Sequence, residues 1–346
     1  TACVGRREKG AGRREEAKAT AASTMGISEA SREEVEESKA RFWREAAVAY
    51  GCVGLWIGLS ATVILYNKWV LSYFGFPYPI SLTMMHMAFS ATLAFLMVRV
   101  FQWVPSCEMT FETYKSTIIP IAALFACTLW MGNAAYMYLS VSFIQMLKAL
   151  MPVAVFLVGV FFGTEKFKSG VLGNMLVVAL GVAIASFGEI NFNIIGFGLQ
   201  MASVASESSR LVLVQILLQS KGLKLNPITT LYYIAPACFV CLGVPWIFLE
   251  LPKITTDTNI TWDPTIFISN AGAAFGLNLG VFLLIGKTSA LTMNIAGVVK
   301  DWMLIGLSYA IYKAPVTAMN LGGYFISFLA VGYYNYSKLQ QKLDAD

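Results

Sequence analysis

The stretch from Ala46 to Leu71 reads AAVAYGCVGLWIGLSATVILYNKWVL and contains one charged residue, Lys68. An α-helix of this length is long enough to cross the hydrocarbon core of a bilayer, which is roughly 30 Å thick. The apolar residues do not alternate with polar ones, as they would in a strand of a membrane barrel. The stretch therefore predicts a transmembrane helix.

Similar apolar segments follow along the rest of the 346-residue chain, of which 57% is hydrophobic and only 13% is charged. Soluble globular proteins have about a quarter charged residues, so lipid is the solvent for most of this surface. We therefore predict an all-α membrane protein with ten transmembrane helices. After the first segment, the others are Pro79–Val104, Thr117–Leu139, Ser142–Phe162, Val171–Phe187, Ile194–Gln219, Ile228–Leu249, Thr265–Ile285, Ala290–Ile311 and Val316–Tyr336.

The basic residues of the connections predict the orientation of the helices. One side has nine Lys and Arg residues and the other has only Lys253 and Lys313. Because cytoplasmic loops are enriched in Lys and Arg, the first side is expected to be cytoplasmic, with both termini on it. Residues 1–45 are expected to form a disordered tail of mixed charge, and residues 339–346 a second tail. The nine basic residues are Arg99, Lys115, Lys166, Lys168, Lys221, Lys224, Lys287, Lys338 and Lys342.

The two halves of the membrane region, residues 46–189 and 190–338, resemble one another. Gly132 and Asn133 precede an apolar run and a serine in the first half, and Gly276 and Asn278 do so in the second. Five spans in each half would give the halves opposite orientations, which is a common transporter architecture with the substrate at the midplane. The alternative is a composition shared by closely packed helices.

Apart from His86, and Arg99 near the end of the second segment, six ionisable residues lie inside the predicted spans, four cations and two acids. An ionisable group at the centre of a membrane costs about 3 kcal/mol, so such residues persist where they face water or a partner. The excess of positive charge predicts an anionic substrate, and lysine and arginine both suit phosphate oxygens. The residues are Lys68, Lys148, Arg210 and Lys300, with Glu207 and Asp301.

Lys300 lies about ten residues, or about 15 Å, inside the ninth segment, on a small, polar strip with Thr292. Its alternative role is a structural ion pair with Asp301 or Glu207. Because neighbouring residues point about 100° apart on a helix, we expect Asp301 to be a poor partner. Lys300 is therefore predicted to contact the substrate.

The other cations each have a structural alternative. Lys148 shares a helix face with Pro152, and a proline inside a span frees a carbonyl group and bends the helix, which is often found beside a cavity. Lys148 could also snorkel to the interface. Arg210 can pair with Glu207 within one helix, and Lys68 can snorkel. The lone histidine, His86, is expected to be buried and hydrogen-bonded rather than a proton relay.

Three motifs give the chain a family resemblance, over roughly residues 46 to 338. They are Tyr66-Asn67-Lys68-Trp69-Val70-Leu71, Ser142 to Ala149 (SFIQMLKA), and Ser289-Ala290-Leu291-Thr292 leading to Val298-Val299-Lys300-Asp301. The chain resembles the nucleotide-sugar transporter and triose-phosphate translocator family of the drug/metabolite transporter superfamily. The resemblance implies alternating access around a central site, with Lys148 and Lys300 on the substrate phosphate. An arginine follows the second lysine in triose-phosphate translocators, whereas Asp301 stands here, as in a plant and algal subgroup whose characterised members move UDP-sugars in the Golgi.

The leading functional hypothesis is an antiporter that moves a UDP-sugar into the Golgi lumen in exchange for UMP. A sugar phosphate/phosphate translocator is the alternative, and a membrane-embedded enzyme or a non-transporting scaffold is less favoured. We expect no cofactor, no metal and no nucleic-acid partner; the oligomeric state is not predicted. The candidate substrate-binding residues are Lys300, Lys148, Arg210, Asn67, Lys68, Thr292 and Asp301, and Asn259 in Asn259-Ile260-Thr261 is a candidate glycosylation site.

Overall fold

The computed structural model describes residues 41, 43–44, 47–105, 109–220, 226–285 and 290–343. The chain divides into two compact units, Thr1–Gly54 and Leu55–Asp346. The contacts that hold the helices together and form the cavities lie within the second unit. The predicted tail at residues 1–45 falls almost entirely outside the described residues.

The described residues form helices and connections, and no strand occurs among them. The predicted segment Ser142–Phe162 is interrupted after Lys148. The third segment begins at Phe111 rather than at the predicted Thr117, because the Thr110 hydroxyl caps a helical turn there. In chain order the elements are the helix Ala47–Ser72, α2 (Pro79–Phe95) with the π-helical turn η1 (Leu96–Val100), α3 (Phe111–Thr113), η2 (Tyr114–Ile118), α4 (Ile119–Ala135), α5 (Val141–Lys148), α6 (Met151–Phe161), α7 (Ser169–Phe187), α8 (Ile194–Ser220), α9 (Pro227–Leu249), α10 (Leu251–Thr256), α11 (Pro264–Ile285), α12 (Ala290–Tyr312) and α13 (Ala318–Leu343).

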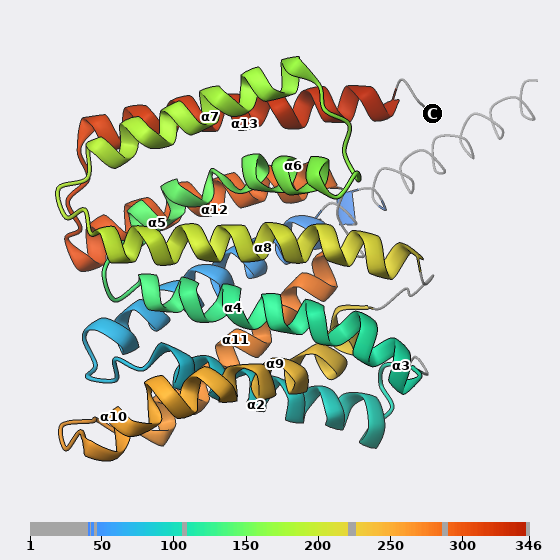
Figure 1. The fold of residues 1–346 in the computed structure, drawn as a ribbon, viewed down its shortest axis with the longest axis vertical. Coiled ribbons are helices and arrows are strands. Elements are labelled where there is room, and N and C mark those ends of the chain that lie inside the picture. Colours follow the sequence, from blue (N-terminus) through green and yellow to red (C-terminus); the bar gives the residue numbers. More distant parts are fainter. Residues whose placement is uncertain are drawn as a thin grey trace, which may run out of the picture. The chain divides into compact units, whose positions relative to one another are not determined.

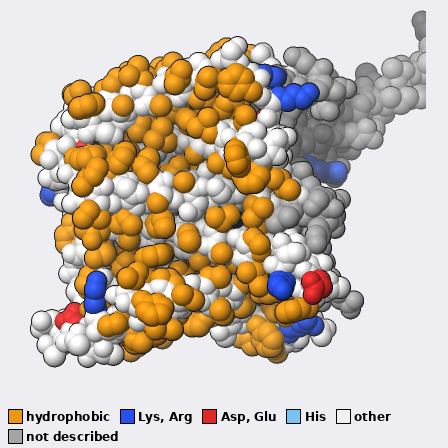
Figure 2. All heavy atoms as spheres, in the orientation of Figure 1, with side chains coloured by type: hydrophobic (Ala, Val, Ile, Leu, Met, Phe, Trp, Pro, Cys, Tyr) orange, Lys and Arg blue, Asp and Glu red, His pale blue; other side chains and the backbone are white. Residues whose placement is uncertain are grey.

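Among the described residues, six helical segments are long and apolar enough to cross a bilayer. Figure 2 shows hydrophobic side chains over most of the visible face, with the Lys and Arg side chains near its edges. The chain is thus a multi-pass membrane protein. The total of ten spans and the inverted repeat stay predictions. The six segments are Ala47–Ser72, Pro79–Val100, Phe111–Ala135, Val141–Phe161, Ser169–Phe187 and Ile228–Leu249.

Neighbouring helices run alongside one another, from α7 and α13 at one edge to α2 and α9 near the other (Figure 1). The pair α7 and α13 is held together at two glycines. A Cβ atom on Gly323 would lie 2.5 Å from the Gly181 carbonyl oxygen, so only glycine permits this approach. Ser327 and Asn320 on α13 donate hydrogen bonds to the backbone of α7, at Val178 and Ala185. Small residues and polar side chains pack these helices without a hydrophobic driving force, as expected in lipid.

A buried carboxylate connects the end of α9 to the start of α2. Glu250 accepts hydrogen bonds from the backbone N–H groups of Ile80 and Ser81, both at 2.7 Å. The Ser81 hydroxyl also donates to Glu250, and Trp246 donates its ring N–H to the Ser81 oxygen at 2.9 Å. An acid satisfies the free N–H groups of a helix N-terminus and complements its dipole. Glu250 therefore fixes the position of α2 against α9.

Candidate functional site

A cavity of about 340 Å³ lies between the helix Ala47–Ser72, α4, the α5–α6 break and α8. Its lining combines apolar side chains with amides, hydroxyls, one lysine and one glutamate. This composition is typical of sites for polar small molecules, in which a few polar groups orient the ligand. The lining residues are Ile64, Asn67, Phe125, Thr128, Leu129, Gly132, Asn133, Tyr136, Lys148, Met151, Gln200, Ser203 and Glu207.

The break between α5 and α6 places Lys148 in this cavity. Pro152 has no N–H group to donate to the carbonyl oxygen four residues earlier, which belongs to Lys148. The helix therefore stops at Lys148 and restarts at Met151, and the N-terminus of the new helix, α6, has no side-chain cap. Interrupted helices of this kind bring a positive helix end to anionic groups at the substrate sites of transporters.

Lys148 is half-buried and makes no ion pair within 4 Å in the described part of the chain. The two acids whose charges act on it are Asp301 and Glu207. Both acids are already engaged with other cations. Lys148 is thus the cation that lines this cavity, and no carboxylate contacts it directly among the described residues.

Arg210 is bound to Glu207 by both ends of its guanidinium group. Its Nε donates to Oε2 at 2.8 Å, and a terminal nitrogen lies 2.5 Å from Oε1. The guanidinium carbon also lies 4.8 Å from the centre of the Phe125 ring. The structural alternative for Arg210, a pair within one helix, is therefore confirmed, while its role as a substrate contact stays a prediction.

Lys300 forms an ion pair with its neighbour Asp301, with 3.4 Å between Nζ and Oδ1. The expectation that Asp301 would be a poor partner is wrong. The 100° separation describes the directions of the Cα–Cβ bonds, whereas four methylene groups let the lysine bend back to its neighbour. Lys300 also lies 5.5 Å from the centre of the Trp56 ring. The two side chains keep 18% and 26% of their surface exposed, so the pair is not sealed from water.

Lys68 is buried and donates to two backbone carbonyl groups beyond the end of α4, those of Tyr136 at 2.5 Å and Leu139 at 3.1 Å. Ser72 donates to the same Tyr136 oxygen. A cation at a helix C-terminus satisfies free carbonyl groups and the negative end of the dipole. These bonds join the helix Ala47–Ser72 to α4, and the predicted contact of Lys68 with substrate stays a prediction.

Asn67 belongs to a buried network of amides that sequence reasoning did not assemble. It donates to Asn133 on α4 at 3.2 Å and accepts from Asn270 on α11 at 3.0 Å. Asn133 donates to Thr83, and His86 is hydrogen-bonded to Asn270, which confirms the expected buried, hydrogen-bonded histidine. The network joins four helices beside the cavity. In the sequence, the signal for this network was the presence of polar side chains inside apolar segments.

Two further polar residues of the cavity come from α8. Gln200 is 1% exposed, and neither polar atom of its side-chain amide has a hydrogen-bond partner among the described residues. Ser203 donates to the Thr128 carbonyl at 2.9 Å, and a Cβ atom at Gly132 would lie 3.1 Å from its oxygen. Gln200 thus has two N–H donors and one carbonyl acceptor that a ligand in the cavity could engage.

The remaining predicted residues lie elsewhere. Thr292 is on α12, but its side chain lies outside the described part of the structure. Asn259 is exposed in the connection between α10 and α11, and its glycosylation stays a prediction. Across the described residues, no group of three or more His, Cys, Asp or Glu side chains could hold a metal ion.

The chain is similar to curated proteins of Arabidopsis thaliana along most of its length. A probable sugar phosphate/phosphate translocator is 55% identical over 299 residues, which cover 86% of this chain and 85% of the relative. A second protein with the same description is 55% identical over 295 residues, covering 85% and 84%. A GDP-mannose transporter is 28% identical over 300 residues, covering 85% and 87%.

A family model matches the same region. The model describes the Triose-phosphate Transporter family, and it aligns with residues 47–337, which include every helix that lines the cavity. The chain therefore belongs to the Triose-phosphate Transporter family.

Proposed function

We propose that this protein exchanges a sugar phosphate for inorganic phosphate across an endomembrane. The observation that carries the proposal is Lys148, a half-buried cation without a direct carboxylate partner among the described residues, at the interrupted helix that borders the central cavity. A phosphate group supplies the missing negative charge, and charge-assisted hydrogen bonds to lysine are strong. The names of the relatives at 55% identity support the same chemistry.

The dimensions of the cavity favour the smaller of the two substrate classes. About 340 Å³ is near the lower end of the range for ligand pockets, which is roughly 300–1,000 Å³. A sugar phosphate is much smaller than a nucleotide sugar, so it fits such a space more readily. The alternative inferred from the sequence, a sugar phosphate/phosphate translocator, is thus better supported than the leading hypothesis of a UDP-sugar and UMP.

Nucleotide-sugar exchange in the Golgi membrane remains the second candidate. It rests on the similarity to a GDP-mannose transporter and on the Lys300-Asp301 pair that the sequence shares with the Golgi subgroup it resembles. For either pair of substrates, we propose that the two inverted halves, each of five spans, rock around the cavity, and that both termini are cytoplasmic.

Counterflow in liposomes containing the purified chain distinguishes the two substrates. Vesicles preloaded with phosphate should take up labelled triose or hexose phosphate, and UMP-loaded vesicles should not stimulate uptake of a UDP-sugar. The opposite pattern would favour nucleotide-sugar exchange. Absence of exchange under any preload would exclude both.

Lys148→Ala is the variant that tests the site. Removing one partner of a buried charge pair costs about 2 kcal/mol or more, so exchange should fall roughly 30-fold or more. Lys115→Ala is the matched control, because Lys115 is exposed on η2 and does not line the cavity. Size-exclusion chromatography checks that both variants stay folded. A folded Lys148→Ala protein that exchanges phosphate at the rate of the control would contradict the assignment.

A further inference from the structure

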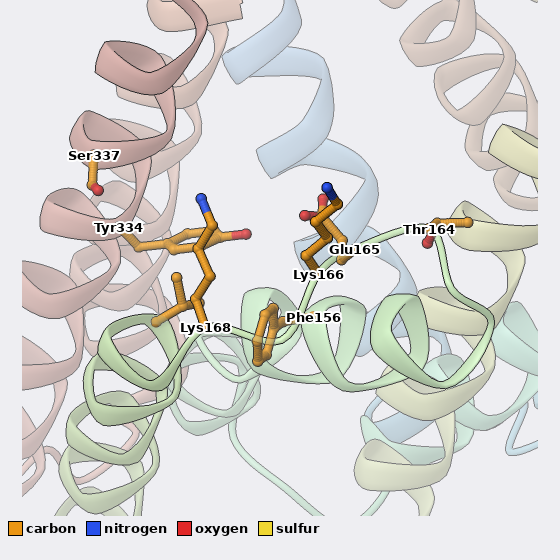
Figure 3. A pocket seen from close by; sticks show the side chains of 8 residues that line it. Phe156, Thr164, Glu165, Lys166, Lys168, Tyr334 and Ser337 are labelled. Carbon is orange, nitrogen blue, oxygen red and sulfur yellow. The ribbon is translucent and has the colours of Figure 1, made fainter.

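A second cavity, of about 260 Å³, lies at the end of the bundle where α6, α7 and α13 meet. The connection between α6 and α7 contributes two lysines, one acid and a threonine, and α13 contributes Tyr334 and Ser337 (Figure 3). Lys168 extends alongside the Tyr334 ring, and the Tyr334 hydroxyl points toward the side where Glu165 and Lys166 lie. The central cavity is lined by different residues, so this is a separate site.

The charges around this cavity favour an anion. Lys166 and Lys168 outnumber Glu165, which gives the three residues a formal net charge of +1. The 19-residue helix α7 begins at Ser169, and its N-terminus has neither a side-chain cap nor an acidic residue in its first turn. A helix N-terminus has free N–H groups and a positive dipole end, which attract phosphate. The lining also includes three hydroxyl-bearing side chains, Thr164, Tyr334 and Ser337, of which Thr164 already donates to the Gly159 carbonyl oxygen at 3.1 Å.

The surroundings of the cavity favour a lipid rather than a soluble anion. Phe161, Phe162 and Phe167 are 82%, 55% and 61% exposed beside the cationic connection. Leu176 and Leu180 on α7 are also exposed along the adjacent helix. Large exposed apolar side chains next to a cationic pocket match a molecule with a charged headgroup and acyl chains. α7 and α13 lie side by side at one edge of the array of helices (Figure 1).

We propose that this cavity binds the phosphate of an anionic phospholipid from the cytoplasmic leaflet. Lys166 and Lys168 contact the headgroup with the N-terminus of α7, and the acyl chains lie along the exposed faces of α6 and α7. Basic pockets between transmembrane helices on the cytoplasmic side bind such headgroups. The bound lipid would link α13 to the α6–α7 connection. This site is independent of the exchange proposed for the central cavity.

Native mass spectrometry of the purified chain tests the proposal with phosphatidylserine and phosphatidylcholine as probes. The wild-type chain should retain phosphatidylserine in preference to phosphatidylcholine. The Lys166→Gln/Lys168→Gln variant should lose this preference, with affinity for phosphatidylserine falling roughly 30-fold for two lysines. Lys115→Gln, a change to an exposed lysine outside the cavity, should retain it.

A charge-reversal variant and competition with inorganic phosphate also test the lipid site. Lys166→Glu alone changes an exposed side chain, so it should fold normally and still reject phosphatidylserine. Inorganic phosphate in millimolar excess should leave the bound lipid in place. Equal retention of phosphatidylcholine, unchanged binding in the folded double variant, or complete displacement by phosphate would each overturn the lipid assignment, the last by identifying a soluble-anion site.

Discussion

Asp301 contacts Lys300, so this lysine has a partner before any substrate arrives. Asp301 also lies within the electrostatic range of Lys148. An incoming phosphate would therefore compete with one carboxylate for two lysines. The hypothesis of a phosphate-bearing substrate therefore cannot depend on an unpaired Lys300. It depends on Lys148.

A charge-balanced pair of variants separates the two roles of Lys300. If Lys300 only neutralises Asp301, then Lys300→Ala should impair the protein and Lys300→Ala/Asp301→Ala should restore exchange, because no unpaired charge remains. If Lys300 holds substrate, the double variant should stay at least about tenfold slower than wild type. The prediction from the sequence, that Lys300 contacts the substrate, requires the second result. Exchange rates in liposomes, together with the amount of folded protein, make the comparison.

The burial of Glu189 should make its contribution to stability depend on pH. It follows α7, is 8% exposed, and its Oε1 has no hydrogen-bond partner among the described residues. Burial raises the pKa of Glu189 to about 7, from an ordinary value of 4.5. The protonated form therefore persists to higher pH in the folded protein than in the unfolded chain.

The contribution of Glu189 to stability should consequently fall as pH rises from about 4.5 to about 7. Because the folded-state pKa exceeds the unfolded one, the contribution of Glu189 is fully present below about pH 4.5 and is lost as pH rises through about 7. Thermal unfolding in detergent between those values should show wild type losing stability relative to Glu189→Gln. Parallel pH profiles for the two proteins would contradict the prediction.

At the scale of elements, the contact between α7 and α13 depends on Gly323, which faces the backbone of α7. In Gly323→Val, Cβ would meet backbone atoms of Gly181 and Ala185 at 3.0 Å or less, so the helices must separate. The expected loss of stability is on the order of 1–3 kcal/mol. Gly322→Val is the matched control, because a Cβ atom there meets nothing within 4 Å. Equal thermal stability of the two variants would show that this approach does not limit packing.

The break between α5 and α6 is the element on which the substrate site depends. Pro152→Ala supplies an N–H group that can donate to the Lys148 carbonyl and favours a continuous helix. We expect stability to be kept or raised, and exchange to fall about tenfold or more, as Lys148 is turned from its position. Circular dichroism and the exchange rate are the two measurements. Full exchange in a Pro152→Ala protein with increased helicity would mean that the break is not needed.

At the scale of the whole molecule, the proposed orientation predicts which surfaces face the cytosol. In a cysteine-free background, Lys166→Cys should react with an impermeant maleimide added to the cytosolic face of sealed vesicles. Thr255→Cys, on the exposed part of α10, should react only after the vesicles are opened. The physical reason is the excess of Lys and Arg in connections on one side. The reverse labelling would invert the orientation.

The sequence by itself determined the helical membrane fold, the missing backbone donor at Pro152 and the family resemblance. These features depend on local chemistry: the length of apolar runs, the missing N–H of Pro152, and motifs that lie close together in the chain. The tertiary structure decided which buried groups meet. Asn67 with Asn270, Glu250 with the N-terminus of α2, and the cavity between α6, α7 and α13 all join residues distant in sequence. Their partners depend on how helices cross and on how side chains bend, and neither is determined by the hydropathy pattern.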